Sequence, residues 1–483
     1  PEDGHGPYGP IRLSPLARRQ RGTPSTPFPI IRDVTIQTTT HATQDATARK
    51  RILALAVPTF GQLVAEPAFV LIDTAIIGHV GDAALAGLSI GSTIVLTVVG
   101  LCVFLAYGTT SNVARLLGAG RRREGLEAGV AGLWLALAIG VAIALALLMF
   151  ARPLCMMMGA RGAVLDNAAV YVRSVACGIP GMLLVYAANG IFRGLRKIGI
   201  TLFAAITGAV LNTVFDLILV VGCGMGVLGS GLGTLAAQWI MALMLVVPVL
   251  VWARREDARV MPNPAAILSS AGDGLVLFVR TLALRACLVA TVVLAAHMGT
   301  RVLAAYQAVN STWNFVLNML DSIAIAGQTL VATEIGAGRK RGAMAMTRAA
   351  SHAGLLGGVI VGCGLVVCGL AAPALFTTNE TIRGLITVGM VVVGMTLPLA
   401  GWMWALDGIL IGAGDYRYLA ATCTATATVY LACLAGLGHL CDVWDADGHM
   451  RMAALWLAVN LLFVGLRALF NGLRARSGAW IRA

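Results

Sequence analysis

Charged residues are scarce in this chain. Asp, Glu, Lys and Arg make up only 12 % of its 483 residues, whereas 58 % are hydrophobic. The mean hydropathy is +0.84, and apolar runs of about twenty residues, enough to cross a bilayer as a helix, recur along the chain. So little charge and so much apolar length exclude an ordinary soluble domain. We therefore expect nearly the whole chain to lie in a lipid bilayer.

Motifs for metal and ATP chemistry are also missing. None of the ten cysteines belongs to a C-x-x-C pair, which argues against a zinc site or a disulfide framework. The chain has no H-E-x-x-H motif and no Walker loop. Gly87–Gly91 fits the G-x-S-x-G pattern of hydrolases, but it lies inside an apolar segment, where helix packing explains the glycines. We expect no enzyme activity, no cofactor and no metal, so an ion gradient or a downhill substrate must supply energy.

Short separators rich in Gly, Arg or Asn divide the apolar sequence into twelve segments. Their lengths are typical of transmembrane helices and predict an all-α polytopic membrane protein. The segments are 52–77, 84–110, 127–150, 164–190, 199–222, 231–252, 270–295, 302–334, 350–376, 384–411, 416–437 and 452–473.

The second half of the chain repeats landmarks of the first at one constant difference in numbering, called the repeat offset here. It is the difference between the numbers of His79 and His297, which is 218. One offset shared over such a length of chain indicates a duplicated unit and predicts two six-helix bundles facing each other across a cleft. The matching landmarks are His79–Gly81 with His297–Gly299, Leu117–Arg121 with Ile335–Arg339, Pro180 with Pro398, and Arg193–Leu195 with Ile411–Ala413.

The net charge of +13 reports orientation rather than nucleic-acid binding. If the N-terminus is cytoplasmic, Lys and Arg concentrate on the cytoplasmic side, as the positive-inside rule requires. The opposite side holds only Arg152, Arg161, Arg301, Arg383 and Arg451. We predict an inner (plasma) membrane protein with both termini in the cytoplasm. Its parts are a disordered tail (1–48), a first lobe (49–255), a linker (256–269), a second lobe (270–473) and a C-terminal tail (474–483).

Ionisable side chains inside the first and fifth segments are candidates for proton binding. Glu66 and Asp73 are seven residues apart, and Asn212 and Asp216 are four apart, so each pair lies on one helix face. Both segments run outward, which places Asp73 and Asp216 in the same half of the membrane, where they can meet. Two neighbouring carboxylates at low dielectric can exchange a proton near neutral pH. Glu66 could instead be a permanently protonated packing group.

Two prolines, Pro58 and Pro67, flank or interrupt the first segment. Each removes a backbone hydrogen bond and allows the helix to bend. We expect this segment to change shape during function.

A polar stripe follows the eighth segment at helical spacing, and such a face is too polar for contact with lipid. We expect it to line an interior cavity. It consists of Gln307, Asn310, Asn314, Asn318 and Asp321.

The sequence does not determine the role of three other charged residues inside the segments. Arg280 and Arg285, in the seventh segment, need an anionic partner or must extend to the membrane surface. Asp407, near the inner end of the tenth segment, is expected to cap a helix end beside Asp415.

Four motifs stand out along the chain: Asp73–Gly81, Gly118–Gly120, Phe192–Leu195 and Asp407–Asp415. Together they resemble the multidrug and toxic compound extrusion (MATE) family, in particular its DinF-like branch. The resemblance covers about residues 50–473 and implies a V-shaped pair of six-helix bundles. It also implies a secondary antiporter that exports amphipathic or cationic organic compounds in exchange for protons or sodium.

The resemblance also implies roles for individual residues. Asp73 is similar to the family's first-span protonation site, and Pro58 stands at the bend described for that helix. Glu66 departs from relatives that carry Gln, and the seventh segment lacks the acidic residue that sodium-coupled relatives use, which favours protons. We expect a monomer that binds small organic substrates. A flippase for a lipid-linked precursor and sodium-coupled antiport are the alternatives. The resemblance further implies a polar network around Asp73, which comprises Asn189, Asn212, Asp216 and Thr234.

Overall fold

A computed structural model describes residues 30–444 and 446–482, except for the side chains of residues 30–46, 66, 68–71, 442 and 482. Residues 45–483 form one compact unit, separate from residues 1–44, and the description below concerns that unit. Within the described residues every regular element is a helix, as the sequence predicts.

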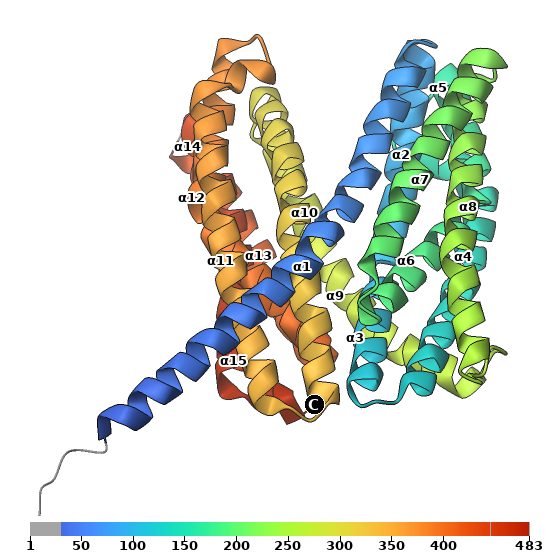
Figure 1. The fold of residues 1–483 in the computed structure, drawn as a ribbon. Helices are drawn as coiled ribbons and strands as arrows, with labels where there is room; N and C mark the ends of the chain where they lie inside the picture. The colour runs from blue at the N-terminus through green and yellow to red at the C-terminus, as the bar shows by residue number, and fades with distance from the viewer. Residues whose placement is uncertain (1–29, 445, 483) are drawn as a thin grey trace, which may run out of the picture. The chain divides into compact units, whose positions relative to one another are not determined.

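The first half of the unit forms one helical bundle, called the N-lobe here (Figure 1). Its helices pack α2 against α5, α3 and α4 against α6, and α7 against α8. They are α1 (Ile30–Gly78), α2 (Asp82–Leu101), α3 (Phe104–Gly118), α4 (Arg122–Met157), α5 (Gly162–Ala176), α6 (Ile179–Gly194), α7 (Ile198–Asp216), the π-helix η1 (Leu217–Gly222) and α8 (Gly226–Arg255).

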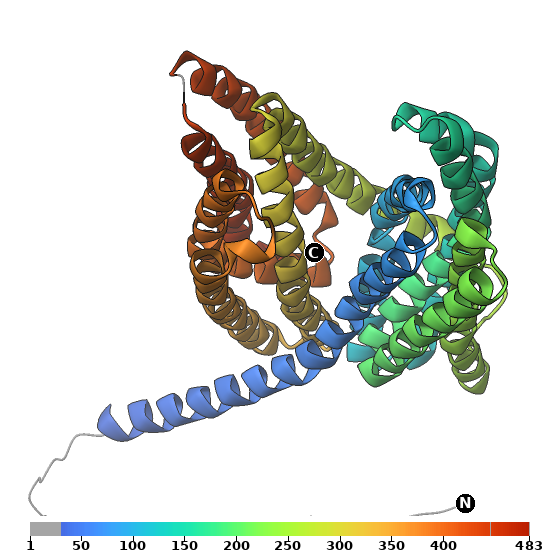
Figure 2. The ribbon, with the colours of Figure 1, turned by 90° about the horizontal axis from the view of Figure 1, so that it is seen from above.

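The second half forms the C-lobe, which lies beside the N-lobe in both ribbon views (Figures 1 and 2). Its helices are α9 (Pro264–His297), α10 (Thr300–Gly336), α11 (Lys340–Ala371), the short 3-10 helix η2 (Pro373–Leu375), α12 (Glu380–Ala413), α13 (Tyr416–Val443), α14 (Gly448–Leu457), the π-helix η3 (Ala458–Val464), α15 (Gly465–Ser477) and η4 (Ala479–Arg482).

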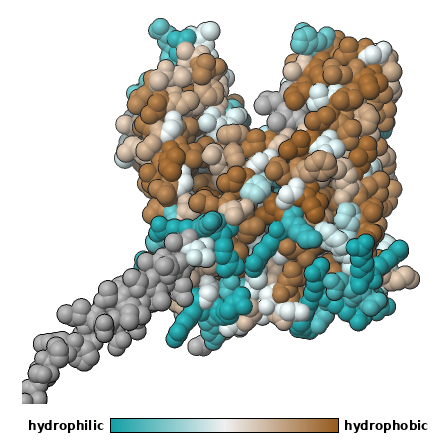
Figure 3. Space-filling view, in the orientation of Figure 1, coloured by the Kyte–Doolittle hydropathy of each residue, from teal (hydrophilic) through white to brown (hydrophobic). Residues whose placement is uncertain are grey.

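Ten of the described helices are long and apolar enough to cross a membrane, or eleven if the bent pair α5–α6 counts as one span. The bend of 50° falls at Gly178, just before Pro180, which occupies the first turn of α6 and cannot continue the preceding hydrogen-bond ladder. The helix α1 supplies the remaining predicted segment. Hydrophobic residues cover the flanks of the unit, whereas hydrophilic ones gather mainly at its lower end, with smaller groups at the upper end (Figure 3).

Two predicted boundaries differ from the structure. The helix α1 begins at Ile30, inside the segment predicted to be a disordered tail, because the run of prolines in the sequence ends at Pro29. The linker is also shorter than predicted, since α9 starts at Pro264, a residue well suited to the first turn of a helix. The remainder of the predicted tail, residues 1–29, lies outside the described residues.

The internal repeat is visible as matched backbone contacts. A Cβ added to Gly118 would lie 2.1 Å from the Thr333 carbonyl oxygen, and one added to Gly336 would lie 1.9 Å from that of Arg115. Adding the repeat offset to the residues of one contact gives the residues of the other. The two contacts hold the C-terminal ends of α3 and α10 together. The histidines of the repeat match as well, since Nδ1 of His79 and Nδ1 of His297 each lie 2.8 Å from the carbonyl oxygen four residues earlier.

We predict that Gly336→Ala destabilises the junction of the two lobes. The new methyl group would overlap backbone atoms of α3, which cannot move away as a flexible side chain can, and overpacking typically costs about 1–3 kcal/mol. Thermal unfolding in detergent should show a lower midpoint. The control is Gly364→Ala in α11, where no atom lies within 4 Å of the added Cβ. An equal midpoint for the two variants would contradict this prediction.

Candidate functional site

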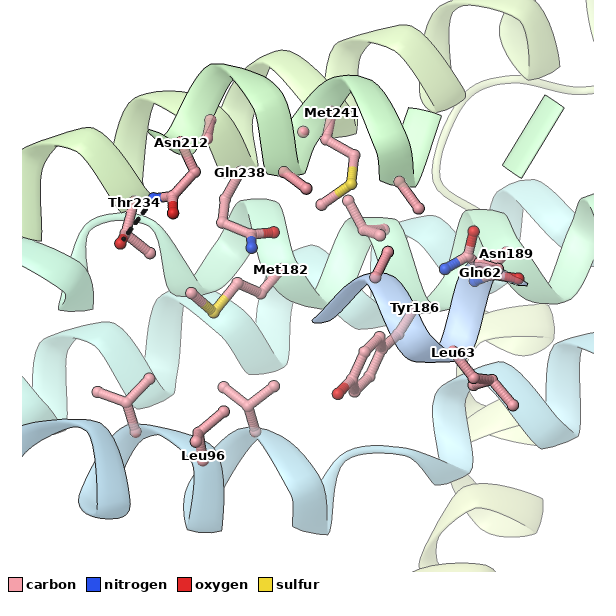
Figure 4. A pocket seen from close by; sticks show the side chains of 18 of the residues that line it. Gln62, Leu63, Leu96, Met182, Tyr186, Asn189, Asn212, Thr234, Gln238 and Met241 are labelled. Carbon is pink, nitrogen blue, oxygen red and sulfur yellow. Dashed lines mark hydrogen bonds between the residues drawn. The ribbon is translucent and has the colours of Figure 1, made fainter. Parts of the chain in front are cut away.

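A cavity of about 260 Å³ is lined mainly by N-lobe helices, with Asn318, Asp321 and Ile325 of α10 contributing from the C-lobe. It is called the N-lobe cavity here (Figure 4). Its wall is mainly apolar, with Met182 and Met241 among the side chains that face it. Polar groups gather at its two ends: Asn212 and Thr234 at one, Gln62 and Asn189 at the other. An apolar chamber with a few fixed polar groups is typical of a small-molecule site.

The predicted carboxylates meet at the first of these ends. Asp73 lines the cavity and is 6 % exposed, and the Ser230 hydroxyl donates a 2.7 Å hydrogen bond to its Oδ1. Asp216, at the end of α7, is fully buried and close enough to Asp73 to interact electrostatically. Gly233 makes room for it, because a Cβ there would lie 2.6 Å from Asp216 Oδ1. The acids of α1 and α7 therefore both lie against the same stretch of α8, at Ser230 and Gly233.

The Asp216 carboxyl has an unusual environment. Neither of its oxygens has a hydrogen-bond partner among the described residues. An ionised carboxylate buried without partners is costly. A charged Asp216 would therefore need a partner that this arrangement of side chains does not give it. Glu66, the third predicted acid, lies in α1, but its side chain is outside the part that the structure describes.

The predicted polar network is partly assembled around these acids. Asn212 Nδ2 donates a 3.2 Å hydrogen bond to the Thr234 hydroxyl, and Tyr171 lies close to both carboxylates. Asn189 lines the other end of the cavity, beside Gln62. Sequence reasoning missed Ser230 and Tyr171, because nothing in the local pattern of α5 or α8 indicates that they face α1 and α7.

A second polar cluster lies at the Gln62 end of the N-lobe cavity. The Tyr107 hydroxyl donates a 3.1 Å hydrogen bond to Asp321 Oδ2, and Arg193 Nη2 donates one of 3.4 Å to Gln62 Oε1. Arg193 is only 4 % exposed and lines the N-lobe cavity, so its charge is buried although it lies close to the end of α6. Its position four residues after Asn189, on the same face of α6, was the available signal.

The polar stripe of α10 lines cavities along only part of its length. Asn314 and Asp321 face a second cavity of about 220 Å³, the C-lobe cavity, and Asp321 also faces the N-lobe cavity. Gln307 and Asn310 line neither cavity. The stripe therefore lines a cavity only in its C-terminal part, from Asn314 to Asp321.

The environment of Asp407, in the wall of the C-lobe cavity, differs most from what the sequence predicts. Asp407 does not cap a helix end: its Oδ2 accepts hydrogen bonds from Arg280 and, at 3.1 Å, from Arg467, and its Oδ1 accepts one from Asn471. All of these side chains are buried. Asp415, expected beside it, pairs instead with Arg474 at 2.6 Å. The anionic partner that Arg280 needs is therefore Asp407, which the sequence places 127 residues away.

Two further sequence interpretations concern metals and hydrolase motifs. Among the described residues, no group of three or more His, Cys, Asp or Glu side chains is placed to hold a metal ion. The glycines of the G-x-S-x-G match lie in helix-packing contacts, where a Cβ on Gly87 would lie 2.5 Å from Asn167 Cβ and one on Gly91 2.7 Å from a Tyr171 ring carbon.

Comparison with known families decides the assignment. The MatE family model matches residues 58–218 and 277–434, one match in each lobe. The chain belongs to the MatE family. Members of this family are efflux transporters of drugs and toxins rather than enzymes, and this MatE chain is accordingly a multi-pass membrane transporter.

Relatives and solved structures agree over nearly the full length of this MatE chain. Protein DETOXIFICATION 44, chloroplastic, from Arabidopsis thaliana is 28 % identical, with 89 % of this chain and 83 % of the relative covered. DNA damage-inducible protein F from Escherichia coli (strain K12) is 27 % identical, with 90 % and 94 % covered. A MOP superfamily transporter from Pyrococcus furiosus matches in structure with a TM-score of 0.78 at 20 % identity, covering 89 % of this chain and 97 % of that one. The predicted twelve-helix fold and the DinF-like MATE resemblance are confirmed.

Proposed function

We propose that this transporter exports amphipathic or cationic organic compounds in exchange for protons. The observation that carries the proposal is the carboxylate pair of α1 and α7 at one end of the N-lobe cavity. Asp73 faces the cavity and accepts a hydrogen bond from the Ser230 hydroxyl. Asp216 is not part of the cavity wall, and its carboxyl oxygens have no hydrogen-bond partner among the described residues. A proton and a cationic substrate would therefore compete for the same negative charge.

The coupling step follows from this arrangement. When Asp73 is ionised, it offers an organic cation a partner inside a chamber lined by methionine and tyrosine side chains. When a proton from outside neutralises it, that attraction is lost and the hydrogen bond to Ser230 changes. Pro58 and Pro67 both lie within α1, where their missing backbone donors make bending inexpensive. Protonation would bend α1, reshape the N-lobe cavity and release the substrate.

Proteoliposomes with an imposed pH gradient test the coupling ion. Uptake of an organic cation such as ethidium should follow the proton gradient and should not respond to sodium at constant pH. Uptake that requires a sodium gradient would favour sodium-coupled antiport. Movement of a lipid-linked anion without either gradient would favour the flippase alternative.

We predict that pH dependence of substrate binding resides in the N-lobe. Under the repeat offset, Asp73 and Asp216 correspond to Thr291 and Leu434, so the C-lobe has no counterpart of the pair. Ethidium affinity, measured over about pH 6–8 where a coupled carboxylate pair can titrate, should lose its pH dependence in Asp73→Asn. It should keep that dependence in Asp321→Asn. The reverse pattern would assign proton binding to Asp321 and its partner Tyr107.

We propose that the protein acts as a monomer in the inner (plasma) membrane with both termini in the cytoplasm, as the positive-inside rule indicates. Cys223, in the turn after η1, is exposed, so a variant that retains it as the sole cysteine should react with a membrane-impermeant maleimide in intact cells. An Arg122→Cys variant of a cysteine-free protein should react only after permeabilisation. Labelling in the opposite order would invert the proposed topology.

A further inference from the structure

We propose that the C-lobe cavity is a binding site for a small organic monocarboxylate, distinct from the N-lobe cavity and its carboxylate pair. This inference goes beyond proton-coupled export, because it assigns a second ligand of opposite charge to the other lobe. It rests on the charge and the unpaired donors of the residues that line that cavity.

The first observation is an excess of buried positive charge. Arg280 and Arg467 both pair with the single carboxylate of Asp407, and their side chains are 8 % and 3 % exposed. Two guanidinium groups sharing one carboxylate leave a net charge of about +1 at low dielectric, which is costly unless another anion completes the site. Asp321 also lines the cavity and interacts with Arg280, but the buried cation of Arg193 balances its charge, so the excess of one positive charge remains.

The second observation is the kind of polar atom left unpaired. Arg280 Nε, Arg467 Nε and Trp313 Nε1 are buried without hydrogen-bond partners among the described residues, and all three side chains line the C-lobe cavity. Each of these atoms is a donor that cannot accept. Three buried donors without partners in the lining of one cavity fit a ligand with acceptor atoms, and a carboxylate can accept from a guanidinium at both oxygens. Arg467 is also near the Cys423 thiol, a weak acceptor.

The third observation concerns size and the apolar wall. The cavity holds about 220 Å³, slightly less than the N-lobe cavity, and both lie below the range of about 300–1,000 Å³ that is typical of drug-sized ligands. Trp313 and Trp404 stand edge to face in its wall, with ring centroids 6.4 Å apart. Aromatic side chains beside a cationic cluster suit a single-ring or short-chain acid better than a bulky lipid.

The repeat offers a natural reference for this site. Under the repeat offset, Arg280 and Asp407 correspond to Gln62 and Asn189 in the N-lobe. The fold therefore accommodates a neutral glutamine–asparagine pair in the same setting, and the charged pair is particular to the C-lobe. A double variant, Arg280→Gln with Asp407→Asn, copies the neutral pair and keeps the net charge through Arg467, whereas Arg280→Gln alone removes it.

The test is calorimetric titration of the purified full chain in detergent with benzoate as the probe. Wild type should bind benzoate at one saturable site, at least about tenfold more tightly than benzyl alcohol, because the charged acceptor contributes the difference. Arg280→Gln should weaken benzoate binding by about tenfold or more. The double variant should recover much of the binding lost in Arg280→Gln, because it restores the net charge although it lacks the Arg280 donor. Asp73→Asn should leave benzoate binding unchanged, which separates this site from the proposed proton coupling.

Several results would overturn the inference. Equal affinity for benzoate and benzyl alcohol would show that the cavity does not select charge. Equal losses in Arg280→Gln and in the double variant would show that net charge does not determine binding. Displacement of benzoate by chloride at similar concentrations would mean that the site takes a small inorganic anion instead. If Arg280→Gln fails to fold, Trp313→Phe provides the readout, since it deletes one unpaired donor, keeps an aromatic ring and should still weaken benzoate binding.

Discussion

Asp73→Asn is expected to abolish transport driven by a pH gradient while leaving the protein folded. Asparagine has nearly the size of aspartate and its side-chain oxygen can still accept the Ser230 hydrogen bond, but it cannot bind and release a proton. Without that exchange, inward proton flow has no link to outward substrate movement. Uptake by proteoliposomes should fall to that of protein-free vesicles.

A matched control separates proton binding from local structure. Ser230→Ala removes the hydroxyl that donates to Asp73 but keeps the carboxyl group, so transport should persist with a shifted pH profile. Equal activity of Asp73→Asn and wild type would show that another group couples the proton. Glu66 would then be the next residue to replace, since it precedes Asp73 on the same helix.

Asp407→Ala is expected to be among the most destabilising single substitutions in the C-lobe. It would leave Arg280 and Arg467 buried without their shared carboxylate, and breaking a buried ion pair from one side typically costs about 3–5 kcal/mol. Thermal unfolding in detergent should show a strongly lowered midpoint or poor recovery of folded protein.

The neutral double variant provides the control for this prediction. Arg280→Gln with Asp407→Asn removes one charge of each sign and installs the pair found in the N-lobe, so most of the lost stability should return. If Asp407→Ala unfolds at the same temperature as wild type, the carboxylate is not holding the two guanidinium groups, and the described ion pair has little energetic weight.

The structure also shows why some sequence interpretations were wrong. Asp407 was assigned to a helix cap because its neighbours in the chain, including Asp415, suggested a helix end. Its real partners come from α9 and α15, and no local spacing reports a contact between helices 60 to 127 residues apart. Arg193 also lies near a helix end, and its guanidinium donates to Gln62 in the wall of the N-lobe cavity, another contact that no local spacing reports.

By itself, the sequence determined the features that depend on local periodicity and on repetition. The apolar segments predicted the helices, because an isolated span must satisfy its own backbone hydrogen bonds in lipid. The constant repeat offset predicted the two lobes, and the spacing of Asp73 and Asp216 on their helix faces predicted that the two acids could meet.

Only the tertiary structure decided which polar groups share a cavity and which neutralise each other. Ser230 reaches Asp73 from α8, Tyr107 reaches Asp321 across the junction of the lobes, and Arg280 reaches Asp407 from α9. These pairings depend on how helices rotate and cross when small residues such as Gly118 and Gly336 let their backbones touch. The rotation of each helix about its axis is set by packing over the whole bundle, so it cannot be predicted from residue spacing within one helix.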